Sequence, residues 1–358
     1  MSNTIVGWDI GGAHLKAVLL NDGGKIIKVL QLPCQLWRGL AQLELAMNNA
    51  LQAFKIKPSD AVHAVTMTGE LVDCFANRHE GVMAIASLSV KLLGKETLFY
   101  AANSGFVRLQ KVNHLTNEIA SANWHASASA LAMHVSDALF IDIGSTTTDI
   151  IAIEAGKVKT AALSDAARMR DDSLVYTGVV RTPMMALAQK LPFEGEQINV
   201  AAEYFATMAD VYRLTAELKS DDAETADGKG KTALESARRL ARMIGHDVET
   251  KPIETWKNLA ETCKTVQIQH IKSAVLKHLK PNTTIIGAGT GSFLVQQIAN
   301  DLDRDYLPAY QPISTAFAAL IDESKQADLE RCFSAFALAC LANKWLAKNP
   351  LALLNQYA

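Results

Sequence analysis

Two short acidic turns hold the residues of this chain whose types and spacing could do chemistry. In the clearer one, an apolar run ends in Asp142, and Gly144, Ser145, Thr146 and Thr147 follow. A glycine lets the backbone approach a ligand closely, and hydroxyls beside backbone N–H groups suit phosphate oxygens. An aspartate next to them suits a hard divalent cation such as Mg²⁺. The stretch predicts a phosphate and metal site, although a simple hairpin with polar tips has the same local pattern.

The first turn has the same design. When Asp9 is aligned with Asp142, Gly11 falls on Gly144, and an apolar run follows each turn. A repeated strand–acidic turn–strand unit is stronger evidence than either motif alone. We therefore expect two similar lobes that contribute one turn each to a shared cleft, with Asp9 and Asp142 as metal ligands. The predicted phosphate-binding residues of the two turns are Gly11, Gly12, Ala13, His14, Gly144, Ser145, Thr146 and Thr147.

The two units differ at the start of their second strand. Lys16 stands in the first unit, and Asp149 occupies the same register in the second. A lysine can reach a phosphate as a point charge, whereas an aspartate suits a metal ion or a nucleophile. A third carboxylate, Glu70, follows a predicted strand end, which is a common position for catalytic groups. Lys16, Glu70 and Asp149 are the predicted catalytic residues, although each also fits an ordinary strand end.

A third glycine-rich turn, Gly287–Gly291, follows a predicted strand and opens a predicted helix. Helix N-termini of this kind bind anions and nucleotides. The turn could also be a dinucleotide fingerprint, but too little chain follows for a full dinucleotide fold. Gly230-Lys231-Thr232 lacks the leading glycine of a P-loop, because position 225 is threonine. The phosphate-binding residues predicted in this third turn are Gly287, Gly289, Thr290 and Gly291.

Three further side chains could contact a substrate. Arg181, just before Thr182-Pro183, could bind a second phosphate or a carboxylate. Asn123 and Trp124 could bond to or stack on an aromatic ligand, although a helix cap with a packed tryptophan fits the same pattern.

Composition narrows the class of protein. The chain has 358 residues, of which 49% are hydrophobic and 20% charged, so about two domains with sizeable cores are expected. A net charge of −2 gives no support for a nucleic-acid or anionic-membrane partner. The five cysteines are scattered without a CxxC pair, which favours neither a zinc site nor a disulfide framework. The start has no signal-peptide pattern, so we expect a cytoplasmic protein.

Alternating strand and helix patterns predict an α/β fold. We expect an N-terminal lobe over 1–136, completed by a helix over 328–358. The C-terminal lobe is expected over 137–327, with a helical insert at about 184–280. Within that insert a long helix is expected over 199–218 with Thr182 capping an earlier one, and an exposed loop over 220–231.

The order of the three turns resembles the acetate and sugar kinase, Hsp70 and actin superfamily. Asp9-Ile-Gly-Gly and Asp142-Ile-Gly-Ser-Thr-Thr are similar to its two phosphate motifs, and Gly287–Gly291 is similar to its adenosine motif. This resemblance covers the whole chain. It implies a two-lobed, actin-like ATPase fold with an interlobe cleft.

A narrower resemblance is to the hydantoinase A/oxoprolinase-like family linked to tetrahydromethanopterin-dependent one-carbon transfer. It rests on the stretches at 67–75, 142–150, 178–183, 205–212 and 225–228. His14 stands where that family pattern has asparagine. The resemblance adds Asp227 as a substrate-binding candidate.

Archaeal members of the family are similar to a methanofuran-biosynthesis enzyme that joins (aminomethyl)furanmethyl diphosphate to the phenol of a tyramine derivative. The resemblance therefore implies an Mg²⁺-dependent transferase that releases diphosphate. A carboxylate such as Glu70 could take the phenol proton, which is a hypothesis about the residue and not part of the resemblance. An ATP-dependent kinase or ATP hydrolase on the same fold is the alternative, and a nucleotide-sensing regulator without turnover is a third. ATP binding, the phenolic acceptor and the oligomeric state, a homodimer included, are left open.

Overall fold

The computed structural model describes residues 4–218, 224–316 and 323–349, and contacts within the chain group into two units. Unit 1 comprises Met1–Phe140, Ile151–Ala167 and Leu307–Ala358, and unit 2 comprises Ile141–Ile150 and Arg168–Tyr306. Each unit contains one of the two acidic turns. The lobe boundaries and the shared cleft expected from the sequence stay predictions.

Unit 1 is built on a six-stranded sheet in the order β3-β2-β1-β4-β5-β6. Every residue of the central strand β1 is buried, and apart from Asp9 its sequence is apolar or glycine, as a strand covered on both faces requires. β1 pairs antiparallel with β2 and parallel with β4, so Lys16 and Thr66 lie on either side of Asp9. The strands are β1 (Ile5–Ile10), β2 (His14–Leu20), β3 (Ile26–Pro33), β4 (Val62–Met67), β5 (Leu98–Ala101) and β6 (Gly105–Val107).

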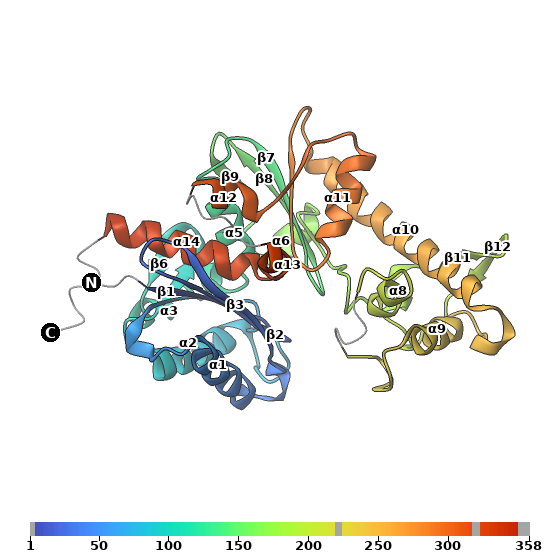
Figure 1. Cartoon of the computed structure of the whole chain (residues 1–358), viewed down its shortest axis with the longest axis horizontal. Helices are drawn as coiled ribbons and strands as arrows, with labels where there is room; N and C mark the ends of the chain where they lie inside the picture. The colour runs from blue at the N-terminus through green and yellow to red at the C-terminus, as the bar shows by residue number, and fades with distance from the viewer. Residues whose placement is uncertain (1–3, 219–223, 317–322, 350–358) are drawn as a thin grey trace. The chain divides into compact units, whose positions relative to one another are not determined.

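Helices cover both faces of this sheet (Figure 1). α1 (Leu40–Phe54) and α2 (Arg78–Leu93) lie on one face, and α5 (Asn123–Leu131) and α14 (Phe333–Lys348) lie on the other. A Cβ added at Gly7 would lie 2.1 Å from the Ala335 carbonyl oxygen, so α14 rests directly on the backbone of β1. The shorter helices are α3 (Leu109–Val112), α4 (Thr116–Ile119), α6 (Asp165–Arg170), α12 (Tyr310–Ala316) and α13 (Glu323–Arg331).

A second sheet has the order β10-β8-β7-β13-β14, and β9 also pairs with β8. The end of β7 and the start of β8 flank the second acidic turn, and α11 (Ser292–Asp301) packs on β13. The strands are β7 (Ala138–Ile143), β8 (Thr148–Glu154), β9 (Lys157–Lys159), β10 (Leu174–Val175), β13 (Ile285–Ala288) and β14 (Tyr306–Pro308).

The insert in unit 2 has fewer helical residues than the sequence pattern predicts. α8, α9 and α10 pack on one another, and α10 also contacts β11 of a two-stranded hairpin. The elements are α7 (Met184–Leu187), β11 (Lys190–Phe193), β12 (Glu196–Asn199), α8 (Met208–Leu214), α9 (Ala233–Arg242) and α10 (Ile253–His278).

The predicted helix over 199–218 is wrong for most of its length. Its first residue ends β12, and only α8 is helical. The backbone N–H groups of Val200 and Ala201 donate to the Gln189 and Met243 carbonyls, so tertiary bonds hold this segment in an irregular path. Hydrogen bonds to residues distant in sequence therefore set the backbone path around Asn199. Helical periodicity in the sequence cannot reveal such bonds.

Two smaller expectations also change. Pro183, not Thr182, precedes α7, because the Thr182 hydroxyl bonds to Gly178 instead. The C-terminal helix is divided at Cys332 into α13 and α14, and α14 packs on β1 as expected. Residues 220–223 of the polar loop predicted over 220–231, and residues 350–358 of the helix expected over 328–358, lie outside the described residues.

Candidate functional site

The first acidic turn places one almost completely buried carboxylate at the end of β1. Asp9 is 2% exposed. Its Oδ2 accepts a hydrogen bond from the Ser334 hydroxyl, and Lys16 Nζ lies 3.8 Å from the same oxygen. Oδ1 is buried and has no hydrogen-bond partner among the described residues. A buried, half-satisfied carboxylate is costly, so Oδ1 is suited to a cation or to a donor on a ligand.

Backbone hydrogen bonds fix the shape of this turn. Gly11 N donates to the His14 carbonyl over 3.0 Å, while the Gly12 and Ala13 carbonyls accept from the loop that follows β3. A Cβ added at Gly69 would lie 3.2 Å from the carbonyl carbon of Gly11, so the end of β4 packs against the turn. The turn is thus braced, and its residues are half-buried rather than exposed.

Glu70 follows that strand end and is fully buried. Ser121 Oγ donates to Glu70 Oε1 over 2.8 Å, and Oε2 has no partner among the described residues. Burial raises the pKa of Glu70 to about 7, against the lowering effects of the Ser121 hydrogen bond and the nearby Arg78. The carboxyl therefore has the proton affinity of a general base at neutral pH, but no surface for a substrate to touch.

The second acidic turn is held from one side by the third glycine turn. A Cβ added at Gly289, whose φ is +89°, would lie 2.3 Å from Asp142 Oδ1. Gly291 N donates to the Ile143 carbonyl over 2.8 Å. The structure therefore brings two of the three predicted motifs together in unit 2. Gly287 is buried against Tyr306, and Thr290 is half-buried at the start of α11.

From the other side, the segment 178–181 packs on the same turn. A Cβ added at Gly178 would lie 2.5 Å from Thr146 N and 2.6 Å from the Gly144 carbonyl oxygen. Val179 N donates to the Gly144 carbonyl, and Arg181 N donates to the Ser145 carbonyl over 2.8 Å. Because these carbonyls and the Gly144 N–H are already bonded, the hydroxyls and the other N–H groups of the turn are the groups suited to a phosphate.

A buried amide supports this segment in turn. Gln267 Nε2 donates to Thr177 Oγ1 over 2.7 Å and to the Gly178 carbonyl over 2.9 Å. The Tyr212 hydroxyl donates to Gln267 Oε1. Gln267 lies on α10 and Tyr212 on α8, so the helical part of unit 2 sets the position of the phosphate turn.

Asp149 is held in an ion pair rather than facing open solvent. Arg168 Nη2 donates to Asp149 Oδ1 over 2.8 Å and to the Ser173 carbonyl over 2.7 Å. The Arg168 side chain is 1% exposed. Lys16 and Asp149, which share a register in the repeat, therefore have opposite environments: a lysine beside Asp9 and an aspartate beside an arginine.

The predicted substrate-binding residues do not share one environment. Trp124 is buried and packs edge-on against His125, and the Asn123 side chain accepts from the Trp124 backbone. Arg181 is exposed, and its own backbone bonds to the second acidic turn. Arg181 is therefore well placed beside a phosphate, whereas Trp124 lies in the interior of unit 1.

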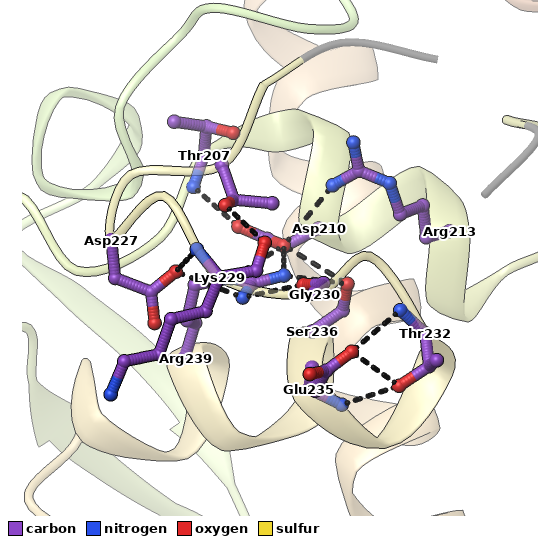
Figure 2. A network of polar contacts seen from close by, with 11 residues as sticks. Thr207, Asp210, Arg213, Asp227, Lys229, Gly230, Thr232, Glu235, Ser236 and Arg239 are labelled. Carbon is purple, nitrogen blue, oxygen red and sulfur yellow. Dashed lines mark hydrogen bonds and ion pairs between the residues drawn. The ribbon is translucent and has the colours of Figure 1, made fainter. Parts of the chain in front are cut away.

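Asp227 is an exposed residue that bonds to a network of buried charged side chains (Figure 2). Its Oδ1 accepts from Lys229 N and Arg239 Nη1, both over 3.1 Å. Partial burial acts to raise the pKa of Asp227, but the Lys229 N–H and the Arg239 guanidinium lower it overall. Arg239 also bonds to the fully buried Asp210, which Arg213 approaches within 3.3 Å. Asp227 thus fastens the loop over 224–231 to α9.

The residues present fit a metal ion that is bound partly by a carboxylate and partly by phosphate oxygens of a ligand. No group of three or more His, Cys, Asp or Glu side chains that could hold a metal occurs in the part of the chain that the structure describes. Single carboxylates next to phosphate-binding turns are the usual arrangement for Mg²⁺, which keeps waters and binds through one or two carboxylates and substrate phosphates.

Three residues that matter for these turns carry no signal in the sequence. Ser334 bonds to Asp9 from a helix 325 positions away. Ser121 reaches Glu70 from a loop, and Gln267 lies within an otherwise ordinary helix. Ser334 and Gln267 are polar residues among apolar neighbours on buried helix faces, which is the one hint that could have singled them out.

Comparisons with known proteins relate this chain to one enzyme family. A family model described as hydantoinase/oxoprolinase matches residues 61–323. A protein of Methanocaldococcus jannaschii named (4-{4-[2-(gamma-L-glutamylamino)ethyl]phenoxymethyl}furan-2-yl)methanamine synthase is 29% identical over 97% of this chain and all of its own length. A synthase of the same name from Methanococcus vannielii is 30% identical over 42% of this chain and 70% of its own length.

Among solved structures, a nucleotide-free acetone carboxylase matches with a TM-score of 0.59 at 10% identity, over 95% of this chain and 70% of its own. With the two hairpin sheets, this likeness confirms the predicted α/β fold of the actin-like ATPase and sugar kinase type. Within the described residues, each helix falls short of the length or apolar character that crossing a bilayer requires.

Proposed function

Because this chain belongs to the hydantoinase/oxoprolinase family, we propose that it is a transferase that forms an aryl ether in the biosynthesis of a methanofuran-type cofactor. The observation that carries the proposal is the end-to-end match to the Methanocaldococcus jannaschii synthase. The name of that relative describes a phenoxymethyl-furan, which is a phenol oxygen joined to a furan methyl carbon. Both curated relatives are synthases, which supports an enzyme.

The proposed donor is (aminomethyl)furanmethyl diphosphate, and the proposed acceptor is a phenol of the tyramine or tyrosine type. The C–O bond to diphosphate breaks, the phenol oxygen bonds to the furan methyl carbon, and the phenol proton passes to the protein. The glycine and hydroxyl turns around Gly11, Gly144 and Gly289 would bind the diphosphate oxygens, with Arg181 and Lys16 as positive groups beside them. A cytoplasmic location belongs to the same proposal.

Asp9 and Asp142 are the residues proposed as Mg²⁺ ligands. When bound, the ion would neutralise charge on the leaving diphosphate. The buried Oδ1 of Asp9, which has no partner among the described residues, supports this assignment. Glu70 is the proposed final acceptor of the phenol proton, because burial favours its neutral form.

The test is direct incubation of the protein with the furanmethyl diphosphate, Mg²⁺ and a panel of phenols: tyrosine, tyramine and glutamyl-tyramine. The expected result is diphosphate and a new ether in equal amounts, the ether identified by mass. A parallel reaction contains ATP in place of the furan substrate. ADP formed from ATP without any ether would overturn the transferase and favour the kinase or hydrolase alternative.

A further inference from the structure

Glu70 presents a chemical problem that its neighbours resolve. The carboxyl is fully buried, so no substrate atom can reach it directly. Yet one of its oxygens, Oε2, has no hydrogen-bond partner among the described residues, and the pKa of the group is about 7. A group that exchanges protons at neutral pH from a buried position needs a relay to the surface.

Ser121 is the hydroxyl in the right place for that relay. Its Oγ lies 2.8 Å from Glu70 Oε1 and 3.4 Å from Asp165 Oδ2. Ser121 is a half-buried residue, whereas Glu70 is fully buried, so Ser121 lies nearer the surface. Asp165 is partly exposed and forms an ion pair with Arg78. All four residues belong to unit 1.

The protonation state of Glu70 decides which carboxylate accepts the Ser121 hydrogen bond. A hydroxyl has one hydrogen and can donate to only one carboxylate at a time. When Glu70 is protonated, its O–H can donate to Ser121 Oγ while Ser121 donates to Asp165. When Glu70 is ionised, Ser121 donates to Glu70 instead. Both arrangements use the observed positions, so Ser121 can switch between them without moving.

The backbone at Ser121 adds a second, independent observation. Its φ is +51°, in the left-handed region that a residue other than glycine rarely adopts. Strain of this kind persists at functional positions where surrounding structure fixes it. Here the preceding residue, Ala120, bridges to Met67 at the end of β4, which is the strand that leads into Glu70. The bridge and the turn together direct the serine toward Glu70.

We propose that Ser121 is the residue that touches the phenol and passes its proton to Glu70. The inference rests on the proposed ether synthesis. In this step the phenol O–H bond breaks and an O–H bond forms at Ser121 Oγ, as the serine's original proton forms an O–H bond at Glu70 Oε1. The phenolate oxygen is then free to attack the furan methyl carbon. After product leaves, the proton returns through Ser121 to Asp165 and from there to water.

Gly81 shows how closely the cluster is built. A Cβ added at Gly81 would lie 2.3 Å from the Glu70 carbonyl oxygen, so α2 approaches the Glu70 backbone at contact distance. Arg78 lies one turn earlier on the same helix and pairs with Asp165. The charged groups facing Glu70 are therefore Arg78, which lowers its pKa, and Asp165, which raises it.

The experiment compares Ser121→Ala and Ser121→Gly with the wild-type protein. Both remove the hydroxyl, but glycine adopts the positive φ without strain, so it separates loss of the relay from damage to the fold. The expected result is a fall in kcat of about 100-fold in both variants, the lower end of acid–base effects, with KM for the diphosphate unchanged. Ser127→Ala, which removes another buried hydroxyl from unit 1, is the control and should keep full kcat.

A second measurement does not depend on turnover. The Glu70 carboxyl is followed by carbon NMR across pH 4–9, with its signal assigned by its absence in Glu70→Gln. Because the Ser121 hydrogen bond lowers the pKa of Glu70, removing the hydroxyl should shift that titration to higher pH.

The two measurements separate the possible failures. A wild-type protein that makes no ether overturns the proposed function, and the link between Ser121 and Glu70 is then judged by the titration. Normal ether synthesis by Ser121→Gly overturns the relay and leaves the proposed function standing. A Glu70 titration that is identical with and without the hydroxyl also overturns it.

Discussion

The two acidic turns descend from one pattern but are supported by different means. The Asp9 carboxylate is held by side chains: Lys16 from the neighbouring strand and Ser334 from α14. The Asp142 turn is braced by backbone: Gly289 lies against its carboxylate, and the segment 178–181 bonds to its carbonyls. Accordingly, the first carboxylate is buried and the second is half-buried.

The two turns thus keep the same backbone pattern while their carboxylates have different environments. A buried aspartate beside a lysine is a fixed charge whose environment is set by the protein. A half-buried aspartate between glycine turns is partly exposed, so a ligand can approach it. We therefore expect the first turn to respond to changes of side chains and the second to changes of backbone.

The largest expected effect comes from neutralising the two carboxylates. Asp142→Asn and Asp9→Asn should each lower kcat/KM by about 1,000-fold, because each removes a charge proposed to hold the metal ion at the leaving group. Ether formation at saturating Mg²⁺ measures the loss. Asp172→Asn, a change of an exposed ion-pair residue of unit 2, should leave kcat/KM unchanged. Full activity of either turn variant would show that its turn holds no metal.

The next effect tests the backbone support of the second turn. Gly289→Ala should destabilise the protein by about 4 kcal/mol, because a Cβ there meets Asp142 and the Ile143 carbonyl at 2.3 Å in a left-handed backbone. Gly195→Ala is the matched control. Gly195 has a φ of +87° and no atom within 4 Å of an added Cβ, so it should cost about 1 kcal/mol. Equal losses in urea unfolding would mean that the contact with Asp142 is unimportant.

A pH-dependent effect comes from Glu70, which follows the strand β4 that packs against the first turn. Burial raises the pKa of Glu70 from 4.5 to about 7, so the folded protein binds that proton more tightly than the unfolded chain. Stability is therefore lost as pH rises from 4.5 to 7, by about 3 kcal/mol at about 1.4 kcal/mol per pKa unit. Glu70→Gln should be more stable than wild type at pH 8 and about equal at pH 4. A constant difference across this range would contradict the raised pKa.

Removing the amide under the second turn should have a moderate effect. Gln267→Leu leaves Thr177, Gly178 and Tyr212 without the bonds that Gln267 provides, so it should cost about 2 kcal/mol of stability. It should also raise KM for the diphosphate about 10-fold with little change in kcat, since the turn shifts. Gln269→Leu, on the exposed side of the same helix, is the control. A change in stability without any change in KM would show that Gln267 does not set the position of the turn.

The smallest expected effect tests the hydrogen bond from Ser334 to Asp9 in the first turn. Ser334→Ala removes the hydroxyl that donates to Asp9 Oδ2, and should cost about 1 kcal/mol. Because Lys16 remains beside Asp9, activity should fall only a few-fold. Thermal unfolding and the ether assay measure both. A loss as large as that of Asp9→Asn would instead make Ser334 essential to the charge at this position.

Local sequence was enough to place the strands and the turns. Apolar runs before and after each turn with an aspartate and a glycine predicted β1, β2, β7 and β8, and their repetition predicted two similar units. It was not enough for 199–218, because bonds to Gln189 and Met243 hold the start of that segment out of a helix. Asp149 was read as a candidate catalytic group, but sequence could not show its buried partner Arg168.

The sequence by itself determined which residue types stand at the turns, because strand period, glycine and hydroxyl content are local properties of the chain. Only the tertiary structure decided what surrounds each carboxylate. Ser334 meets Asp9, Gly289 meets Asp142, and Ser121 meets Glu70 through packing between segments far apart along the chain. Burial and partners set the charge and proton affinity of a group, and both are properties of the folded core rather than of any motif.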